Sequence, residues 1–455
     1  MYGKINRIHF VGIGGIGMSG IAEVLVNMGY RVTGSDIKQS PGIQRLQDLG
    51  VEVFIGHDSN NVGNTDVVVT SSAIIGSNPE VEFAIANKIP VIARAEMLAE
   101  LMRLKFGIAV VGSHGKTTTT SMISSVLFHG DLDPTIVVGG KVKKLGSNAR
   151  LGKGKFMVVE ADESDGSFQK LSPVISVLTN IDLEHIDHYE NIENLEAEFA
   201  RFLDKIPFYG LSVLCADCPR VRKLESKYNK RHITYGHAND ADLTIRNVRV
   251  SGFNTFFNVS LHGELLGEIE LNVAGRHNAL NSLAAVAVGL ELGMSFEDIK
   301  KGLYEFSGID RRLQLKGNKE GIMVIDDYGH HPSELKTTIE SLEESFSRKP
   351  VVVFQPHRFS RTKLLFNEFV EVLSNVNKLY VLDIYPAGEK PLEGTDSKIL
   401  VEAIRATGKN DTQYVDNPDK LIGMLKKKIS SGDIVLTSGA GNVWIYGEKL
   451  LEELS

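Results

Sequence analysis

The sequence contains few of the features that mark secreted, membrane-spanning or nucleic-acid-binding proteins. Only 2 of its 455 residues are cysteine, which excludes a disulfide framework and favours a reducing compartment. No apolar run approaches the roughly 18 residues that a membrane span needs. Basic residues number 50 against 57 acidic ones, a net charge of −7, so a surface for nucleic-acid phosphates is disfavoured. Low-complexity tracts and repeats of solenoid period are also absent.

The remaining composition is that of an ordinary globular protein. Hydrophobic residues make up 42% and charged residues 24%, which excludes disorder as the main state, and the length predicts roughly three domains. Residues 1–10 run directly into a strand-like stretch and lack a signal-peptide pattern. We therefore expect a cytoplasmic protein without nucleic-acid or membrane partners. The sequence leaves open whether it is a monomer or a homodimer.

Three blocks follow one another along the chain, and each opens with a short apolar strand that leads into a turn. These strands are Ile8–Gly12, Gly107–Gly112 and Gly321–Asp326. Strands then alternate with helical stretches, which predicts an α/β fold with mostly parallel sheets. From about Ala241 to Val273, alternation of period two without a helix predicts a small antiparallel extension of the second block. The predicted domains are residues 1–105, 106–316 and 317–455.

A glycine-rich loop follows the first strand. Gly12-Ile13-Gly14-Gly15-Ile16-Gly17 fits G-x-G-x-x-G and opens a helix, so its backbone can approach a diphosphate at a helix N-terminus. Asp36, 19 residues beyond Gly17, ends a second strand, where a carboxylate can accept a hydrogen bond from a ribose hydroxyl. A nicotinamide dehydrogenase is the obvious interpretation. The pattern nevertheless indicates a diphosphate-ribose group more securely than it indicates which nucleotide, and the glycines alone could serve a tight turn.

A second phosphate loop opens the second block. Gly112-Ser113-His114-Gly115-Lys116-Thr117 again joins a strand to a helix. Backbone N–H groups in such a loop point at phosphate oxygens, a lysine reaches the β- and γ-phosphates, and a threonine hydroxyl binds Mg²⁺. The loop is shorter than the standard pattern, because only two residues separate Gly112 from Gly115. Its strand, Gly-Lys-Thr and helix together still predict an ATP site.

Further polar groups end two neighbouring strands. Glu160 ends the strand Met157–Glu160, and Asp182 and His185 follow the strand Ile175–Thr179. The carboxyl ends of parallel strands meet at one edge of a sheet, so these groups are expected beside the loop. Mg²⁺ prefers oxygen ligands, and one hydroxyl needs carboxylate help to hold it.

Two nucleotide-phosphate loops in one chain suggest that one nucleotide is carried on a substrate and the other supplies energy. With these residues in hand, the whole chain resembles the Mur ligases of peptidoglycan synthesis. The motifs that carry the resemblance are GIGGIGMSGI at 12–21, GSHGKTTT at 112–119, EADES at 160–164, TNIDLEHIDHY at 179–189, GRHNALN at 275–281, Arg311-Arg312, DDYGHHP at 326–332, QPHRFSR at 355–361 and YPAGE at 385–389.

The resemblance implies a role for each domain. The first, Rossmann-like domain would bind the UDP of UDP-N-acetylmuramate, and the central domain, with its ATPase-like parallel sheet, would bind ATP. The third, again Rossmann-like, would bring the amino acid. The residues implied for the UDP-sugar are Gly12, Gly14, Gly15, Ile16, Gly17, Asp36, Ser71, Ser72 and Ala73; those for Mg²⁺ are Thr117, Glu160 and His185.

For ATP the resemblance implies the phosphate loop, an adenine segment and residues at the start of the third domain. These are Gly112, Ser113, His114, Gly115, Lys116, Thr117, Thr118, His277, Asn278, Asn281, Arg311, Arg312 and Asp327. Asn278 and Asn281 are three residues apart and share a helix face, although capping of that helix is the alternative for both.

The amino-acid site implied by the resemblance contains Tyr328, His330, His357, Arg358 and Arg361. Arg358 and Arg361 are three residues apart, so on one helical turn they face the same way, and a guanidinium pairs bidentately with a carboxylate such as that of alanine. A solvent-exposed face is the alternative for both. The candidate catalytic residues are Lys116, Glu160, His185, His330, Arg358 and Arg361, with His330 as the base for the attacking amine.

Within the family, the resemblance is to the members that join L-alanine to UDP-N-acetylmuramate with ATP and Mg²⁺. Members acting on later substrates use a carbamylated lysine, and the corresponding stretch here, NLEAEFAR at 194–201, has no lysine. A recycling ligase that adds an intact tripeptide stays open as the alternative, with a dehydrogenase as a remoter one. Cys215 and Cys218 form a C-x-x-C pair without a second pair nearby, so we assign them no role.

Overall fold

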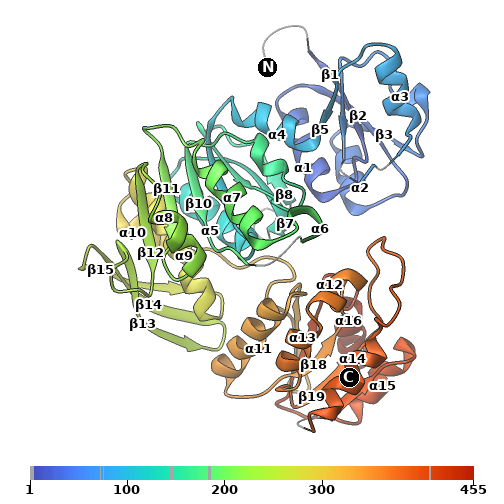
Figure 1. Cartoon of the computed structure of the whole chain (residues 1–455), viewed down its shortest axis with the longest axis vertical. Helices are drawn as coiled ribbons and strands as arrows, with labels where there is room; N and C mark the ends of the chain where they lie inside the picture. The colour runs from blue at the N-terminus through green and yellow to red at the C-terminus, as the bar shows by residue number, and fades with distance from the viewer. Residues whose placement is uncertain are drawn as a thin grey trace. The chain divides into compact units, whose positions relative to one another are not determined.

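A computed structural model describes residues 5–71, 73–74, 76–142, 147–182, 186–408 and 411–454 (Figure 1). The chain divides into two compact units. The first comprises residues up to 247, 257–270 and 279–307, and the second comprises 248–256, 271–278 and those from 308 onward. Three sheets, flanked by helices, confirm the predicted α/β class.

The first sheet, drawn in blue in Figure 1, has five parallel strands in the order β3-β2-β1-β4-β5. The order reverses at β1, so a crevice outside the carboxyl ends of β1 and β4 is the expected ligand position. The glycine loop leaves β1 at this point. The elements are β1 (Arg7–Val11), α1 (Ile16–Asn27), β2 (Arg31–Asp36), α2 (Pro41–Asp48), β3 (Glu52–Ile55), η1 (Ser59–Asn61), β4 (Val67–Thr70), α3 (Pro79–Ala86), β5 (Val91–Ala93) and α4 (Arg94–Met102).

The second sheet has ten strands in the order β15-β14-β13-β12-β11-β10-β6-β9-β7-β8. Its middle is parallel, and β6 lies between β10 and β9, so the phosphate loop after β6 has the ends of both neighbours beside it. The strands are β6 (Phe106–Val111), β7 (Thr135–Val142), β8 (Ser147–Arg150), β9 (Phe156–Glu160), β10 (Ile175–Leu178), β11 (Leu211–Cys215), β12 (His232–Gly236), β13 (Leu243–Ser251), β14 (Asn254–Leu261) and β15 (Glu264–Leu271). The helices are α5 (Lys116–His129), η2 (Ser167–Lys170), α6 (Ile186–Tyr189), α7 (Ile192–Leu203), α8 (Pro219–Glu225), α9 (Arg276–Glu291) and α10 (Phe296–Tyr304).

The predicted extension of this sheet consists of β13, β14 and β15. Two-residue turns join these neighbours in the sheet, and only antiparallel strands can be joined so tightly. Its first strand, β13, also pairs with β12 in parallel, which the period-two pattern did not reveal.

The third sheet has the order β16-β17-β21-β18-β19-β20, and every pair is parallel except β16 with β17. Both faces are covered: Val352 and Phe354 of β18 enter one apolar core, and Val351 and Val353 enter another. This explains why that strand is apolar at every position. The elements are β16 (Gln314–Lys319), β17 (Ile322–Asp327), α11 (Pro332–Phe346), β18 (Val351–Phe354), α12 (Phe359–Leu364), α13 (Phe366–Leu373), β19 (Lys378–Val381), α14 (Ser397–Ala406), β20 (Asp411–Tyr414), η3 (Pro418–Lys420), α15 (Leu421–Lys426), β21 (Ile434–Ser438) and α16 (Trp444–Glu453).

Among the described residues, no helix has both the length and the apolar character needed to cross a bilayer.

Candidate active site

The glycine loop is held against the end of β2. The backbone N–H groups of Gly12 and Ile13 donate to the carbonyl of Ser35 at 2.9 and 3.0 Å. The N–H of Gly14 donates to Oδ2 of Asp36 at 2.8 Å, and Gly12 has a φ of 81° that favours glycine. Asp36 therefore fixes the loop through one carboxylate oxygen. Its contact with a ribose hydroxyl stays a prediction.

The segment after β4 lies beside the same loop. A Cβ added to Gly12 would lie 3.1 Å from Cβ of Ser71, and Oγ of Ser71 accepts a hydrogen bond from the N–H of Ala73 at 3.2 Å. Ser72 lies outside the described residues. The structure thus places Ser71 and Ala73 at the edge where the sequence predicts the UDP-sugar.

Arg94, at the start of α4, lies against the far end of the glycine loop and was missed by sequence reasoning. A Cβ at Gly17 would lie 3.1 Å from Cδ and Nη1 of Arg94, so the arginine side chain packs directly over this glycine and would have to shift slightly for a larger residue. Nη2 of Arg94 lies 3.9 Å from Oδ2 of Asp162 in the EADES segment. The sequence did indicate that a basic residue is needed from elsewhere, because residues 12–17 contain no basic side chain to balance the charge of a diphosphate.

The second phosphate loop is supported by the chain that follows β10. Thr179 donates its hydroxyl to the carbonyl of His114 at 2.7 Å, and the N–H of His114 donates to Oδ1 of Asn180 at 2.8 Å. Gly115, with a φ of 80°, caps the N-terminus of α5. These bonds set the backbone of the loop at the start of a helix, the arrangement that favours phosphate.

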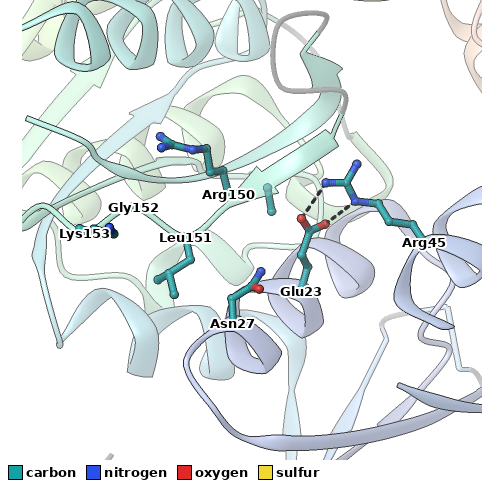
Figure 2. Close-up of a pocket in the computed structure, with 8 residues that line it drawn as sticks. Glu23, Asn27, Arg45, Arg150, Leu151, Gly152 and Lys153 are labelled. Atoms are coloured by element: carbon teal, nitrogen blue, oxygen red, sulfur yellow. Dashed lines mark hydrogen bonds and ion pairs between the residues drawn. The ribbon is translucent and has the colours of Figure 1, made fainter. Parts of the chain in front are cut away.

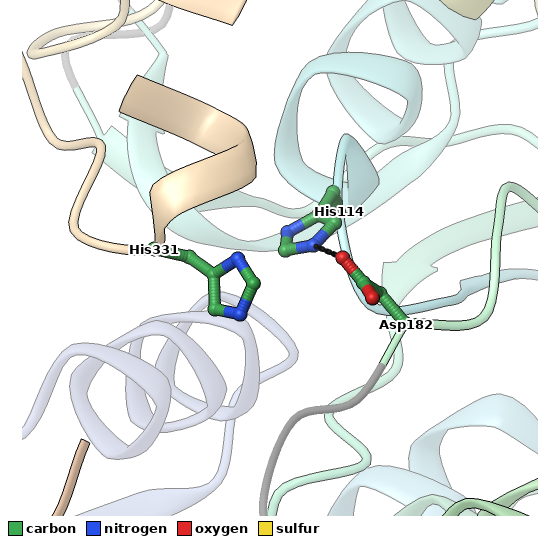
Figure 3. Close-up of side chains that lie close together, drawn as sticks. All are labelled: His114, Asp182 and His331. Carbon is green, nitrogen blue, oxygen red and sulfur yellow. Dashed lines mark hydrogen bonds and ion pairs between the residues drawn. The ribbon is translucent and has the colours of Figure 1, made fainter. Parts of the chain in front are cut away.

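His114 and Asp182 are joined by a hydrogen bond beside this loop. Nε2 of His114 lies 3.0 Å from Oδ2 of Asp182, as the dashed line in Figure 3 shows. Ser113 ties the same segment down, because its hydroxyl accepts from the N–H of Asp182 at 2.8 Å. Asp182 therefore lies at the edge that the sequence predicted.

Lys116 lies inside the loop and donates to three oxygens. Its Nζ lies 2.6 Å from the carbonyl of Gly112, 3.0 Å from that of Ser113 and 2.8 Å from Oε1 of Glu163. Burial favours the neutral amine, but the carboxylate of Glu163 outweighs it and raises the pKa of Lys116 to about 12. The ammonium is therefore favoured while Glu163 is ionised, although burial raises the pKa of Glu163 as well. Glu163 is buried and was missed by sequence reasoning, although its motif was noted.

Thr117 and Glu160 meet beside Lys116. The hydroxyl of Thr117 donates to Oε1 of Glu160 at 2.8 Å, and the N–H of Gly139 donates to Oε2 at 2.6 Å. A hydroxyl and a carboxylate of this kind fit the oxygen preference of Mg²⁺. His185, the third predicted ligand, lies outside the described residues.

The predicted adenine residues lie at the start of α9. Nδ2 of Asn278 donates to the carbonyl of Ala274 at 2.6 Å, so this amide holds the start of its own helix. Oδ1 of Asn281 lies 2.8 Å from the position that a Cβ at Gly115 would take. Burial lowers the pKa of His277 to about 4, which keeps its ring neutral. Adenine contact stays a prediction for all three.

In the second unit, Arg311 and Asp327 both interact with groups of the protein itself. Nε of Arg311 lies 3.0 Å from Oδ2 of buried Asp326. Asp327 accepts from the N–H groups of Leu313 at 2.8 Å and Gly329 at 2.7 Å. Burial raises the pKa of Asp327 although these bonds oppose it. Their predicted contacts with ATP remain predictions.

Tyr328 is flanked by cations and by a histidine. The guanidinium carbons of Arg311 and Arg312 lie 4.9 and 5.4 Å from its ring centroid, and the ring of His330 packs edge-on at 5.5 Å. His331 caps α11 by accepting from the N–H of Ser333. This hydrogen bond gives His331 a structural role at the start of α11.

His330, His357 and Arg361 form a compact group at the carboxyl ends of β17 and β18. The two rings lie 5.7 Å apart, and Nη1 of Arg361 lies 3.3 Å from Nδ1 of His357. Burial, aided by the charge of Arg361, lowers the pKa of His330 to about 3 and that of His357 to about 4. Both imidazoles are therefore neutral at neutral pH.

These low pKa values predict a pH-dependent stability. A histidine in the unfolded chain has a pKa of about 6.5. Below that pH the unfolded chain is protonated at His330 and His357, whereas in the folded protein both rings stay neutral. Stability should fall as the pH drops from about 6.5 towards 4, by about 1 kcal/mol for each histidine at pH 5 after solvent screening. Urea unfolding at pH 7 and pH 5 measures the loss, and His357→Gln should make it smaller. An equal loss in both proteins would contradict the prediction.

A separate pocket of about 420 Å³ lies within the first unit, beside the last turns of α1. Figure 2 shows Glu23 and Arg45 paired at its wall, 3.0 and 2.8 Å apart, while Arg150 points away from them. Its other lining residues are Asn27, Ala149, Leu151, Gly152 and Lys153. None of the predicted site residues lines it, so we place no chemistry there.

Three family models match the chain in order. Residues 7–106 match the model "Mur ligase family, catalytic domain", 110–289 match "Mur ligase middle domain" and 311–441 match "Mur ligase, glutamate ligase domain". The chain belongs to the Mur ligase family. The family resemblance of the sequence motifs is thereby confirmed.

This Mur ligase is similar over its full length to proteins of known name. It is 54% identical over 455 residues to the UDP-N-acetylmuramate–L-alanine ligase of a Geobacter species, covering 100% of this chain and 99% of that protein. The protein of the same name from Geotalea daltonii is 54% identical over 454 residues, with the same coverage.

Solved structures give the same fold. A UDP-N-acetylmuramate–alanine ligase from Thermotoga maritima superposes with a TM-score of 0.84 at 29% identity, covering 98% of each chain. A murein peptide ligase from Psychrobacter arcticus superposes with a TM-score of 0.73 at 23% identity, covering 99% of this Mur ligase and 98% of that chain. At this lower identity, the similarity to the Psychrobacter arcticus structure supports the fold alone.

Proposed function

We propose that this Mur ligase joins L-alanine to the lactyl carboxylate of UDP-N-acetylmuramate, with ATP converted to ADP and phosphate, in the cytoplasmic synthesis of peptidoglycan precursors. The observation that carries the proposal is the 54% identity over the full chain with proteins named for this reaction. A dehydrogenase would leave the second phosphate loop, with Lys116, Thr117 and Glu160, without a purpose.

The proposed division of labour follows the three predicted domains, 1–105, 106–316 and 317–455. The glycine loop after β1 takes the diphosphate of the UDP-sugar, and the loop after β6 takes the phosphates of ATP. The ends of β17 and β18 take alanine. The ligand-bound enzyme is a monomer or a homodimer in this proposal, and all its substrates are small molecules.

The reaction proceeds in two balanced steps. An oxygen of the lactyl carboxylate attacks the γ-phosphorus of ATP, the bond to the β,γ-bridging oxygen breaks, and an acyl phosphate and ADP result. The amine of alanine then attacks the acyl carbon, phosphate leaves with the former carboxylate oxygen, and the nitrogen loses a proton. Activation is needed because a free carboxylate is a poor electrophile.

Lys116 supplies the fixed positive charge for the first step. Its ammonium lies inside the loop against the carbonyls of Gly112 and Ser113 and the carboxylate of Glu163, and its raised pKa favours the protonated form. Charge builds on the transferred phosphoryl group, and a preorganised cation stabilises it without reorganisation. Binding of ATP must exchange one of the three oxygens now bonded to Lys116 for a phosphate oxygen.

Thr117 and Glu160 would hold the Mg²⁺, since both oxygens lie at the loop and are 2.8 Å apart. When bound, the metal neutralises phosphate charge and orients the γ-phosphate. The N–H of Gly139 fixes the other oxygen of Glu160, so the carboxylate is already aimed at the loop.

His330 is the proposed proton acceptor for the second step. With a pKa of about 3, its neutral ring is a weak base that cannot deprotonate the ammonium form of alanine. The nitrogen becomes far more acidic once it has bonded to the acyl carbon, and only at that stage is the neutral ring proposed to accept its proton. Alanine must therefore enter as the free amine.

Phosphate release tests the proposal directly. The enzyme with ATP, Mg²⁺ and UDP-N-acetylmuramate should release phosphate when L-alanine is added, and little when the tripeptide L-Ala-γ-D-Glu-meso-diaminopimelate replaces it. Release with the tripeptide alone would assign the recycling reaction instead. If neither amine caused phosphate release and the absorbance of an added nicotinamide cofactor changed instead, the chain would be a dehydrogenase.

A further inference from the structure

Arg358 adopts a backbone conformation that is rare for a residue with a side chain. It has φ 70° and ψ 134° and stands at the N-cap of α12, and its own side chain does not cap the helix. Such a conformation is unfavourable for a residue with a side chain and persists only where the surroundings impose it. A second segment of the chain must therefore hold this turn in place.

That segment is the loop after β19, Tyr385–Glu389, which sequence reasoning had noted without a role. The N–H of Arg358 donates to the carbonyl of Tyr385 at 2.8 Å, and the N–H of Tyr385 donates to the carbonyl of Pro356 at 2.8 Å. The rings of His357 and Tyr385 are stacked, with centroids 5.5 Å apart and planes inclined by 7°. The loop thus holds the turn at Arg358 through two backbone hydrogen bonds and through the stacked ring of Tyr385.

Glu389, at the end of this loop, supplies the cap that α12 lacks. Its Oε2 accepts from the N–H of Ser360 at 3.0 Å, and its Oε1 accepts from the hydroxyl of Ser360 at 2.6 Å. Oε1 also lies 3.6 Å from Nε of Arg358. Burial opposes the charge, but the Ser360 bonds and Arg358 outweigh it, so the pKa of Glu389 is below its usual range.

The position of this carboxylate relative to the guanidinium is significant. Among the guanidinium nitrogens of Arg358, Nε lies 3.6 Å from Oε1 of Glu389. A carboxylate pairs bidentately with a guanidinium edge in a fixed plane. The negative charge beside Nε and the constrained backbone limit the orientations of the guanidinium before the ligand arrives, which reduces the ordering cost of binding.

We propose that Glu389 is a positioning residue that sets Arg358 for the α-carboxylate of L-alanine. Glu389 touches no reacting atom and acts through Arg358 and the first turn of α12. This inference rests on the proposed function, and it adds to it a residue on which the affinity for the amino acid depends. A purely structural cap would affect all substrates alike, whereas a positioning residue affects alanine alone.

The test compares Glu389→Gln, Glu389→Asp and a matched control, Glu393→Gln. Glutamine keeps an oxygen for Ser360 but removes the charge that faces Arg358, and aspartate keeps the charge on a shorter stem. Glu393 is an exposed acid a few residues further along the same connection. Steady-state KM and kcat are measured separately for alanine, ATP and UDP-N-acetylmuramate, with the melting temperature of each variant.

Glu389→Gln should raise the KM for alanine about ten-fold or more, in the range of a lost charge-assisted contact. Its KM values for ATP and UDP-N-acetylmuramate should stay within about two-fold, Glu389→Asp should recover part of the loss, and Glu393→Gln should behave as wild type. An unchanged KM for alanine, or an equal rise in all three KM values, would overturn the inference. A wild-type enzyme without alanine-dependent turnover would instead overturn the proposed function.

Discussion

Lys116→Ala should lower turnover by at least about 10²–10³-fold, the usual effect of removing one preorganised electrostatic donor. The lysine is buried in the phosphate loop, and its ammonium is bonded to Gly112, Ser113 and Glu163. The substitution removes the ammonium that is proposed to stabilise the transferred phosphoryl group. Single-turnover phosphate release, with ATP saturating, measures the chemical step apart from binding.

A matched control is available in the same unit. Lys223 has an exposed side chain that pairs with the largely buried carboxylate of Glu196 at 2.7 Å, and Arg220 lies 3.6 Å from the same carboxylate, so a cation remains beside it after the substitution. Lys223→Ala should therefore turn over as wild type does. Near-normal turnover in Lys116→Ala would show that the loop after β6 does not carry out phosphoryl transfer in the proposed way.

Glu160→Gln should have the second large effect, a fall in turnover of about 10²-fold or more at ordinary Mg²⁺ concentration. The carboxamide keeps the size of the side chain and one oxygen, but it loses the charge that favours a divalent cation. Activity should be partly recovered as Mg²⁺ is raised, since the lesion is in affinity for the metal. A Mg²⁺ titration of phosphate release distinguishes this result from simple misfolding.

Glu198→Gln is the control for that experiment. Glu198 forms an ion pair with Arg201 on the surface of α7, so its loss should change neither turnover nor the Mg²⁺ dependence. If Glu160→Gln required no more Mg²⁺ than wild type, Glu160 would not be a metal ligand. Its bonds to Thr117 and Gly139 would then serve only to hold β7 and β9 beside the loop.

The parts of the site that the sequence predicted are those set by local pattern and sheet geometry. A strand, a Gly-Lys-Thr turn and a helix place Lys116 and Thr117 within a few residues of one another. Glu160 was expected beside them because it ends a strand of the same parallel sheet, and the structure places it 2.8 Å from Thr117. These residues come together because the carboxyl ends of neighbouring parallel strands lie at the same edge of the sheet.

The parts that were missed depend on contacts between distant segments. Glu389 reaches Ser360 across 29 residues and a neighbouring strand, and no periodicity reports where the loop after β19 folds back. Arg94 approaches Asp162 because α4, which carries it, packs against η2, a few residues after the EADES segment. Glu163 was missed for another reason. The EADES motif contains three acidic residues, and only the structure shows that Glu163 is the one that pairs with Lys116.

The most direct test of the account uses UDP-N-acetylmuramate whose lactyl carboxylate carries heavy oxygen. The enzyme is given ATP, Mg²⁺ and L-alanine, and the phosphate and the nucleotide product are analysed by mass spectrometry. The account predicts phosphate that carries one heavy oxygen, and a product heavier than the substrate by one alanine residue with one labelled oxygen left. Unlabelled phosphate, or a UDP-sugar recovered without alanine, would contradict the central claim that this chain is an alanine-adding ligase working through an acyl phosphate.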